Sequence, residues 1–398
     1  MALTADEVAA RARNAAITIE DGYDVPGGQL YKWPDGSEEA ILSRITDTLA
    51  AYPQLVTNLG YSWAKDRASY RTYGDAMFQW NVLELLAEVD PRHPNLSGFK
   101  PVAARQAINR DFISYAQPGR ELHLIFIGRG FMDVLKYFME MTLNIMDLAP
   151  GTHERSAWGP ASLQEIRKRH NRDVVEIVNA FLDQAIRVIR GEFPDRHGPI
   201  RDRLVAAPNL MWTTYDAVES FIVAHELGHL LERHDVHDAT TGKEVSADQA
   251  AISLQLARHG TQKEMFGTSL IATMAVSLGG PAFYLLGSLY YLISALEAWI
   301  RHKPIEPFIG TLASLKVRWF YYRKYLLDIG SPTLTSPHLI GLYRMVTLCM
   351  EGVFATSMWF NLKGVGKPEP FLDEEFVNML WGDWLDDEIA IPEAPSAE

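Results

Sequence analysis

The sequence predicts a mostly helical α+β protein that contains a small β-sheet. Through most of the chain, apolar residues recur at spacings of three and four, as they do in helices that bury one face. One short segment is instead β-branched and aromatic, which is typical of a strand. At 398 residues the chain is long enough for a large core, and we expect two or three domains.

The first hundred residues predict a helical accessory region. Segments 1–20, 37–53 and 74–88 have the spacing of amphipathic helices, and a glycine-rich turn around Pro26 separates the first two. The apolar stripe predicted for the third segment consists of Met77, Trp80, Leu83 and Leu86. Proline and glycine residues after position 90 mark a boundary near residue 100. Before that boundary we find no chemical motif.

The clearest strand is 121–127, and Gly128 and Gly130 follow it. Helical spacing begins at Phe131, and a long helix is predicted over about 162–190. We expect one domain over residues 101–385, helical in its C-terminal part. The remaining residues, 386–398, form an acidic tail rich in proline and alanine that we expect to be disordered.

Composition and charge narrow the class of protein. The net charge is −13 and no basic stripe is present, which argues against a nucleic-acid partner. The single cysteine, Cys349, excludes an internal disulfide and fits a reducing compartment; its apolar surroundings predict a place in the core. The N-terminal segment carries acids and lacks the apolar run of a signal peptide, so we expect a cytoplasmic protein.

Two segments in the C-terminal half allow alternative interpretations. Residues 265–296 form a stretch without charged side chains that is long enough for a membrane span. However, Gly279-Gly280-Pro281 divides this stretch into two short halves. We predict a buried helical hairpin here, with membrane insertion as the alternative. Residues 310–328 form an aromatic and basic helix, for which we expect a solvated face beside a packed stripe. Its basic residues are Lys316, Arg318, Arg323 and Lys324.

Residues 221–231 contain the pattern His225-Glu226-x-x-His229, which is typical of zinc peptidases. A capping box at 213–216 predicts where the helix that carries them begins. On a helix, His225 and His229 lie one turn apart on the same face, so both imidazoles can bind one metal ion. Glu226 is rotated by about a quarter-turn, which puts it beside the metal as a candidate base.

A catalytic zinc site needs a third protein ligand. Glu244 and Asp248 lie at i and i+4 on a second predicted helix, 244–254, which follows a short polar loop. If the loop folds the two helices together, Glu244 reaches the metal and Asp248 accepts a ring N–H from a ligand histidine. The alternative ligands in and near the loop are His234, Asp235 and His237.

Together these two halves resemble the gluzincin metallopeptidases, whose third zinc ligand is a glutamate on a following helix. The pattern is similar to those of the HtpX-like and CAAX-prenyl proteases, the ImmA/IrrE peptidases and the Lit-type phage-exclusion peptidases. The resemblance implies a gluzincin-like core, with two zinc-bearing helices beside a small sheet and helical regions at both ends of the chain. The implied roles are zinc ligand for His225, His229 and Glu244, catalytic base for Glu226, and partner of a ligand histidine for Asp248.

Two further elements are similar to the HtpX-like family. One is the strand at 121–127 with the helix after it. In gluzincins a strand edge near the metal pairs with an extended substrate, so this strand is either that edge or a core strand. The other is Ser336-Pro337-His338 with Arg344 downstream, which resembles a His-Pro…Arg element. The candidate donors to an oxyanion are therefore His338, Tyr343 and Arg344.

The resemblance implies a zinc-dependent endopeptidase that cleaves a protein or peptide substrate, with Zn2+ as its cofactor. Glu226 would act as general base toward the attacking water. Two alternatives stay open. One is a noncatalytic zinc-containing sensor or scaffold, and the other is a membrane-embedded HtpX-like protease.

Overall fold

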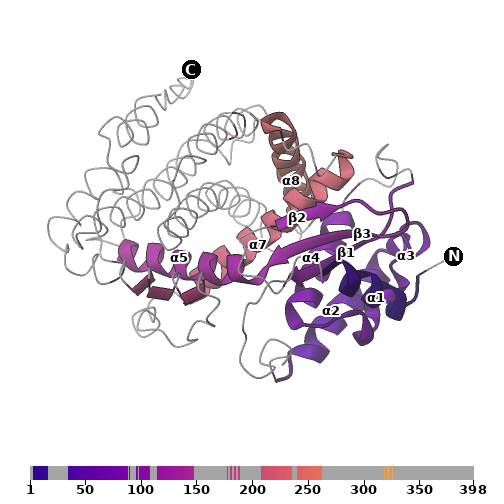
Figure 1. Ribbon diagram of the computed structural model, residues 1–398, viewed down its shortest axis with the longest axis horizontal. Coiled ribbons are helices and arrows are strands. Elements are labelled where there is room, and N and C mark those ends of the chain that lie inside the picture. The colour runs from indigo at the N-terminus through magenta and orange to yellow at the C-terminus, as the bar shows by residue number, and fades with distance from the viewer. Residues whose placement is uncertain are drawn as a thin grey trace, which may run out of the picture.

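The computed structural model describes residues 3–16, 35–87, 98–107, 114–147, 208–234 and 240–261, and single positions at 89, 96, 177, 180, 181, 183, 184, 187, 188, 318, 321 and 325. In this part of the chain the protein is mostly helical with one three-stranded mixed sheet, as the sequence predicts (Figure 1). The seven positions between 177 and 188 are all helical. The predicted hairpin at 265–296 and the tail at 386–398 lie outside the described residues.

Short helices make up the N-terminal part of the structure. They are α1 (Ala5–Ala16), α2 (Ser37–Ala51), α3 (Gln54–Thr57), the 3-10 turns η2 (Tyr61–Lys65) and η3 (Arg67–Ser69), and α4 (Tyr73–Ala87). Thr4 and Glu7 form a capping box at the start of α1, since each side chain accepts from the other's backbone N–H, at 2.8 and 3.3 Å. The helices α2 and α4 match the predicted segments 37–53 and 74–88 to within two residues, and α1 covers the middle of the segment 1–20, of which 17–20 lie outside the described residues.

Helix α4 is buried on nearly every side, so the prediction of a single apolar stripe is wrong. Met77 and Trp80 of that stripe are only partly buried, whereas the polar Asp75 and Gln79 are fully buried. The reason is that α4 packs against α2, the strand β1 (Val102–Ala107) and the long helices α7 (Pro208–Leu231) and α8 (Thr241–Thr261). A helix with neighbours on all sides has no solvent-facing stripe.

The sheet has the strand order β1-β3-β2. Its strands are β1 (Val102–Ala107), β2 (Ser114–Gln117) and β3 (His123–Gly128); β1 runs parallel to β3, and β2 runs antiparallel to it. The predicted strand is therefore the central one, which settles the choice in favour of a core strand. Gln79 of α4 covers the outer side of β1: it donates to the Val102 carbonyl and accepts from the Ala104 N–H, both at 3.1 Å. The other edge strand, β2, contacts α7.

In the part of the chain that the structure describes, three long helices follow the sheet: α5 (Arg129–Asp147), α7 (Pro208–Leu231) and α8 (Thr241–Thr261). Figure 1 shows α5 extending away from the sheet and α8 crossing near the end of α7. Helix α7 begins at Pro208, earlier than the capping box predicted at 213–216. Proline suits this position because the first helical N–H has no partner within the helix. Among the described helices, none has the length and hydropathy of a membrane span.

Candidate metal centre

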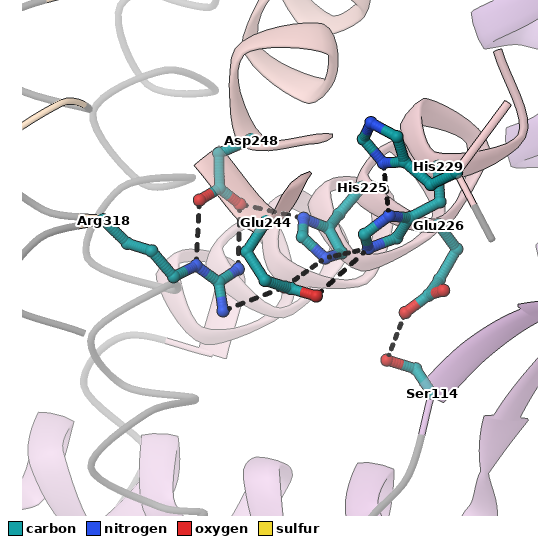
Figure 2. Close-up of polar contacts among 8 residues, drawn as sticks. Ser114, His225, Glu226, His229, Glu244, Asp248 and Arg318 are labelled. Carbon is teal, nitrogen blue, oxygen red and sulfur yellow. Dashed lines mark hydrogen bonds and ion pairs between the residues drawn. The ribbon is translucent and has the colours of Figure 1, made fainter. Parts of the chain in front are cut away.

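Three side chains from α7 and α8 converge on one point (Figure 2). The Nε2 atoms of His225 and His229 are 3.1 Å apart. The Glu244 carboxylate lies against both, with Oε2 at 3.3 Å from Nε2 of His225 and Oε1 at 3.5 Å from Nε2 of His229. These three residues can hold a metal ion.

The spacing of the three donors suits a small tetrahedral ion. With metal–ligand bonds of about 2.0–2.1 Å, tetrahedral geometry separates neighbouring ligand atoms by about 3.3–3.4 Å. Here the two nitrogens are 3.1 Å apart, and a different oxygen of Glu244 lies near each of them, at 3.3 and 3.5 Å, so each contact is close to that value. Two imidazoles with one carboxylate form a donor set typical of first-row transition metals, whereas Ca2+ and Mg2+ prefer oxygen ligands.

The close crossing of α7 and α8 brings Glu244 to the two histidines. Gly228, between the histidines in sequence, faces the backbone of α8: a Cβ added there would lie 2.8 Å from the Ala247 carbonyl oxygen and 3.0 Å from the Ala250 Cβ. Ala247 and Ala251 of α8 are fully buried. Small residues on both helices therefore allow the approach that places the first turn of α8 over the histidine face of α7.

Asp248 lies one turn after Glu244 and is buried, with only 2% of its surface exposed. Its Oδ1 is 2.8 Å from Nδ1 of His225, the ring nitrogen that faces away from the other two donors. A carboxylate at that nitrogen keeps the proton on Nδ1 and leaves the Nε2 lone pair for a metal. The Asp248 contact predicted from the sequence is thus present.

Arg318 reaches this cluster, although the sequence predicted a solvated face for its segment. Its Nε and Nη2 donate to the two oxygens of Asp248, each at 3.0 Å, and its Nη1 lies 3.1 Å from Oε2 of Glu244. The Arg318 side chain is 15% exposed. A planar guanidinium that spans two carboxylates fixes the orientation of both. Figure 2 shows Arg318 and Asp248 on one side of the histidine pair and Glu226 on the other.

Glu226 stands apart from the three donors and is 4% exposed. Ser114, the first residue of the edge strand β2, donates from Oγ to Oε1 of Glu226 at 2.7 Å. Burial raises the pKa of Glu226, and the nearby His225 and the Ser114 hydrogen bond oppose that shift. The result is a desolvated carboxylate beside the donor cluster, held by one oxygen.

Burial and neighbouring charges shift the pKa values of the three donor residues in different directions. Burial alone would lower the pKa of His225, but hydrogen bonds with Asp248 and Glu244 outweigh it and raise that pKa to about 10. Burial and the adjacent His225 lower the pKa of His229 to about 4. Burial would raise the pKa of Glu244, yet the contacts with His225 and Arg318 lower it to about 2.

Sequence reasoning did not identify Ser114 or Arg318 as residues of the site. Of the alternative ligands, His234 lies outside the three-donor group and contacts the far nitrogen of His229. Asp235 and His237 lie outside the described residues, as do Cys349 and the three candidate oxyanion donors, His338, Tyr343 and Arg344. Their roles stay predictions.

Comparison of the chain with protein-family models, with curated proteins and with solved structures finds no match. The function is therefore inferred from the residues and their geometry.

Proposed function

We propose that this protein is a zinc-dependent endopeptidase with a gluzincin-like core. The observation that carries the proposal is the pairing of a His225–His229–Glu244 donor group with a buried carboxylate, Glu226, that does not belong to it. A site that only holds a metal needs its ligands and their partners. It does not need a further desolvated acid next to them.

The ligands in this proposal are His225, His229 and Glu244, each of which offers one atom within 4.8 Å of the others, close enough to share one zinc ion. Zinc bound there supplies Lewis acidity, which lowers the pKa of water and polarises a peptide carbonyl. Asp248 and Arg318 orient His225 and Glu244 for this task through the contacts described above.

Glu226 is the proposed general base. It takes a proton from the attacking water and then delivers it to the leaving amine, so that one carboxylate serves both half-steps. Its burial favours this role, because a carboxylate with a raised pKa is a stronger base than an exposed one. The Ser114 hydrogen bond holds the carboxylate in one orientation while the proton moves.

The proposed substrate is a protein or peptide in extended conformation. Ser114 ties the edge strand β2 to Glu226, so a peptide segment that pairs with this edge would pass close to the base. The strand predicted for this purpose, 121–127, cannot serve because β1 and β2 occupy both of its sides.

The test is Glu226→Gln, which keeps the size and hydrogen-bonding capacity of the side chain but removes the base. We expect the variant to retain about one zinc ion per chain and its thermal stability, while proteolysis falls by about two to four orders of magnitude. The measurements are elemental analysis and a proteome-wide comparison of new N-termini in the native host.

The matched control is Glu39→Gln, the same change at an exposed position of α2. It should leave zinc content and cleavage products as in the wild type. If Glu226→Gln produced the same new N-termini as the wild type, the noncatalytic sensor or scaffold would replace the peptidase. If it lost zinc or unfolded, Glu226 would have a structural role.

A further inference from the structure

The C-terminal end of α7 adopts a specific hydrogen-bonded shape. The last regular helical bond runs from the Glu232 N–H to the Gly228 carbonyl at 2.9 Å. Beyond it, the Arg233 N–H donates to the Leu230 carbonyl at 3.2 Å and the His234 N–H donates to the His229 carbonyl at 2.9 Å. This pair of bonds defines a Schellman motif, which brings the residue after the left-handed position next to the residue three from the helix end.

The left-handed position of this motif is occupied by arginine instead of glycine. Arg233 has φ 55°, and among the described residues no other non-glycine residue has a positive φ. Such a conformation costs about 1–2 kcal/mol for a residue with a Cβ. Strained positions of this kind persist where the surrounding structure requires them, often near functional groups.

The residue that the motif brings back onto the helix is His234, and the residue it meets is the ligand candidate His229. Their Nδ1 atoms are 2.9 Å apart, and their rings are inclined at 65° with centroids 5.2 Å apart. In Schellman motifs an apolar contact frequently occurs at this place. Here it is a hydrogen bond between two imidazoles, which requires that only one of the two nitrogens carry a proton.

The geometry decides which nitrogen that is when His229 binds a metal. Nε2 of His229 faces Nε2 of His225 and the Glu244 carboxylate, so Nε2 must present its lone pair and the proton must sit on Nδ1. That Nδ1–H then donates to Nδ1 of His234. His225 has the equivalent support from Asp248. Each histidine ligand thus has one acceptor, from α8 in one case and from the end of α7 itself in the other.

We infer that His234 is a positioning residue of the metal centre, which fixes the ring orientation and tautomer of His229 through the hydrogen bond between their Nδ1 atoms. This inference rests on the proposed function, because it assigns His229 to a metal. His234 is not itself a ligand in this inference, because its Nδ1 contacts the side of His229 that faces away from the donor group.

The test compares the zinc affinity of three full-length variants with that of the wild type, by competition with a chromophoric chelator. His234→Ala removes the acceptor, and we expect zinc to bind about 10–100-fold more weakly. His234→Asn restores a side-chain oxygen acceptor near the place of Nδ1, and most of the affinity should return. Arg233→Gly relieves the backbone without touching the imidazole, so affinity should stay at the wild-type value.

Unchanged affinity in His234→Ala would overturn the inference, and so would a failure of asparagine to recover any of the loss. A loss in both variants as complete as in His225→Ala would make His234 a ligand and overturn it as well. The proposed function fails in a different way: zinc binding would then be absent from the wild type or unaffected by His225→Ala.

Discussion

Of the two histidines in the donor group, only His225 is an imidazolium at neutral pH. His225 is held between two carboxylates and has a pKa of about 10, whereas His229 beside it has a pKa of about 4. With Glu244 ionised at a pKa of about 2, the group carries one titrating proton at neutral pH, the second ring proton of His225. A metal ion that binds through the Nε2 of His225 must displace it.

Zinc uptake by chelator-stripped protein should therefore release about one proton per ion at pH 7. Because the proton leaves only when zinc binds, the apparent affinity should rise about tenfold per pH unit between pH 7 and 9 and level off as the pH passes the pKa of His225. The released protons can be counted by calorimetry in two buffers with different protonation enthalpies.

Asp248→Asn is the matched variant for this measurement, since it removes the charge that keeps His225 protonated but retains the shape of the side chain. Proton release in that variant should fall below that of the wild type. Equal release in both proteins, or no release in the wild type, would show that His225 does not carry the proton.

The crossing of α7 and α8 depends on one glycine. Gly228→Ala places a Cβ 2.8 Å from the Ala247 carbonyl oxygen, which is backbone and cannot rotate away. Alanine improves helix propensity by up to about 1 kcal/mol, but overpacking of this kind costs about 1–3 kcal/mol, so we expect a net loss of stability. Since the helices must separate, Glu244 moves away from the histidines and zinc affinity should fall.

The control for this substitution is Gly242→Ala, in the first turn of α8. A Cβ there meets nothing within 4 Å, so the change should be neutral or stabilise the protein by about 0.5 kcal/mol. Thermal denaturation measures the stability of both variants, and competition with a chelator measures their zinc affinity. If Gly228→Ala were as stable and bound zinc as tightly as Gly242→Ala, the close crossing would not set the geometry of the site.

Local pattern was enough to predict the elements that build the donor group. His225 and His229 share one helix face, and Glu244 and Asp248 share another, as their spacing predicts. That the two faces meet was expected only if the loop folded the helices together, and the structure brings them together. The strand β1 was missed because its sequence, Val-Ala-Ala-Arg-Gln-Ala, lacks β-branched residues after the first; it forms because Gln79 and the neighbouring strand satisfy its backbone.

The spacing of residues in the sequence does not predict contacts between distant parts of the chain. Ser114 and Glu226 are separated by 112 positions, and Arg318 and Asp248 by 70. Nothing in the local sequence marks that serine or that arginine as different from its neighbours. Only the folded arrangement brings the start of an edge strand and a basic residue of the C-terminal half to the same cluster.

Helix α4 shares one partly buried polar network with α7 and α8. Arg258 of α8 donates to the Asn81 side chain at 3.1 Å and to the Ser220 hydroxyl at 2.7 Å, and it forms an ion pair with Glu84. Asn81 in turn donates to Glu219 of α7 at 3.1 Å. The Arg258 guanidinium also lies over the Trp80 ring. Helix α4 is therefore bound to both helices of the candidate metal centre.

Arg258→Met should destabilise both parts of the protein together. Methionine keeps much of the side-chain volume but leaves Glu84 and Asn81 without their cationic partner, and the loss of one member of such a partly buried network costs about 3 kcal/mol. Since α4 and α7 share the network, hydrogen exchange should speed up by similar factors in peptides from 73–87 and from 218–231.

Arg44→Met is the control: Arg44 also stacks on Trp80 but is exposed, so its loss should cost at most about 1 kcal/mol. Faster exchange confined to one of the two peptides would mean that α4 opens independently of α7. The N-terminal helices would then unfold as a separate accessory unit and would not belong to the same cooperative fold.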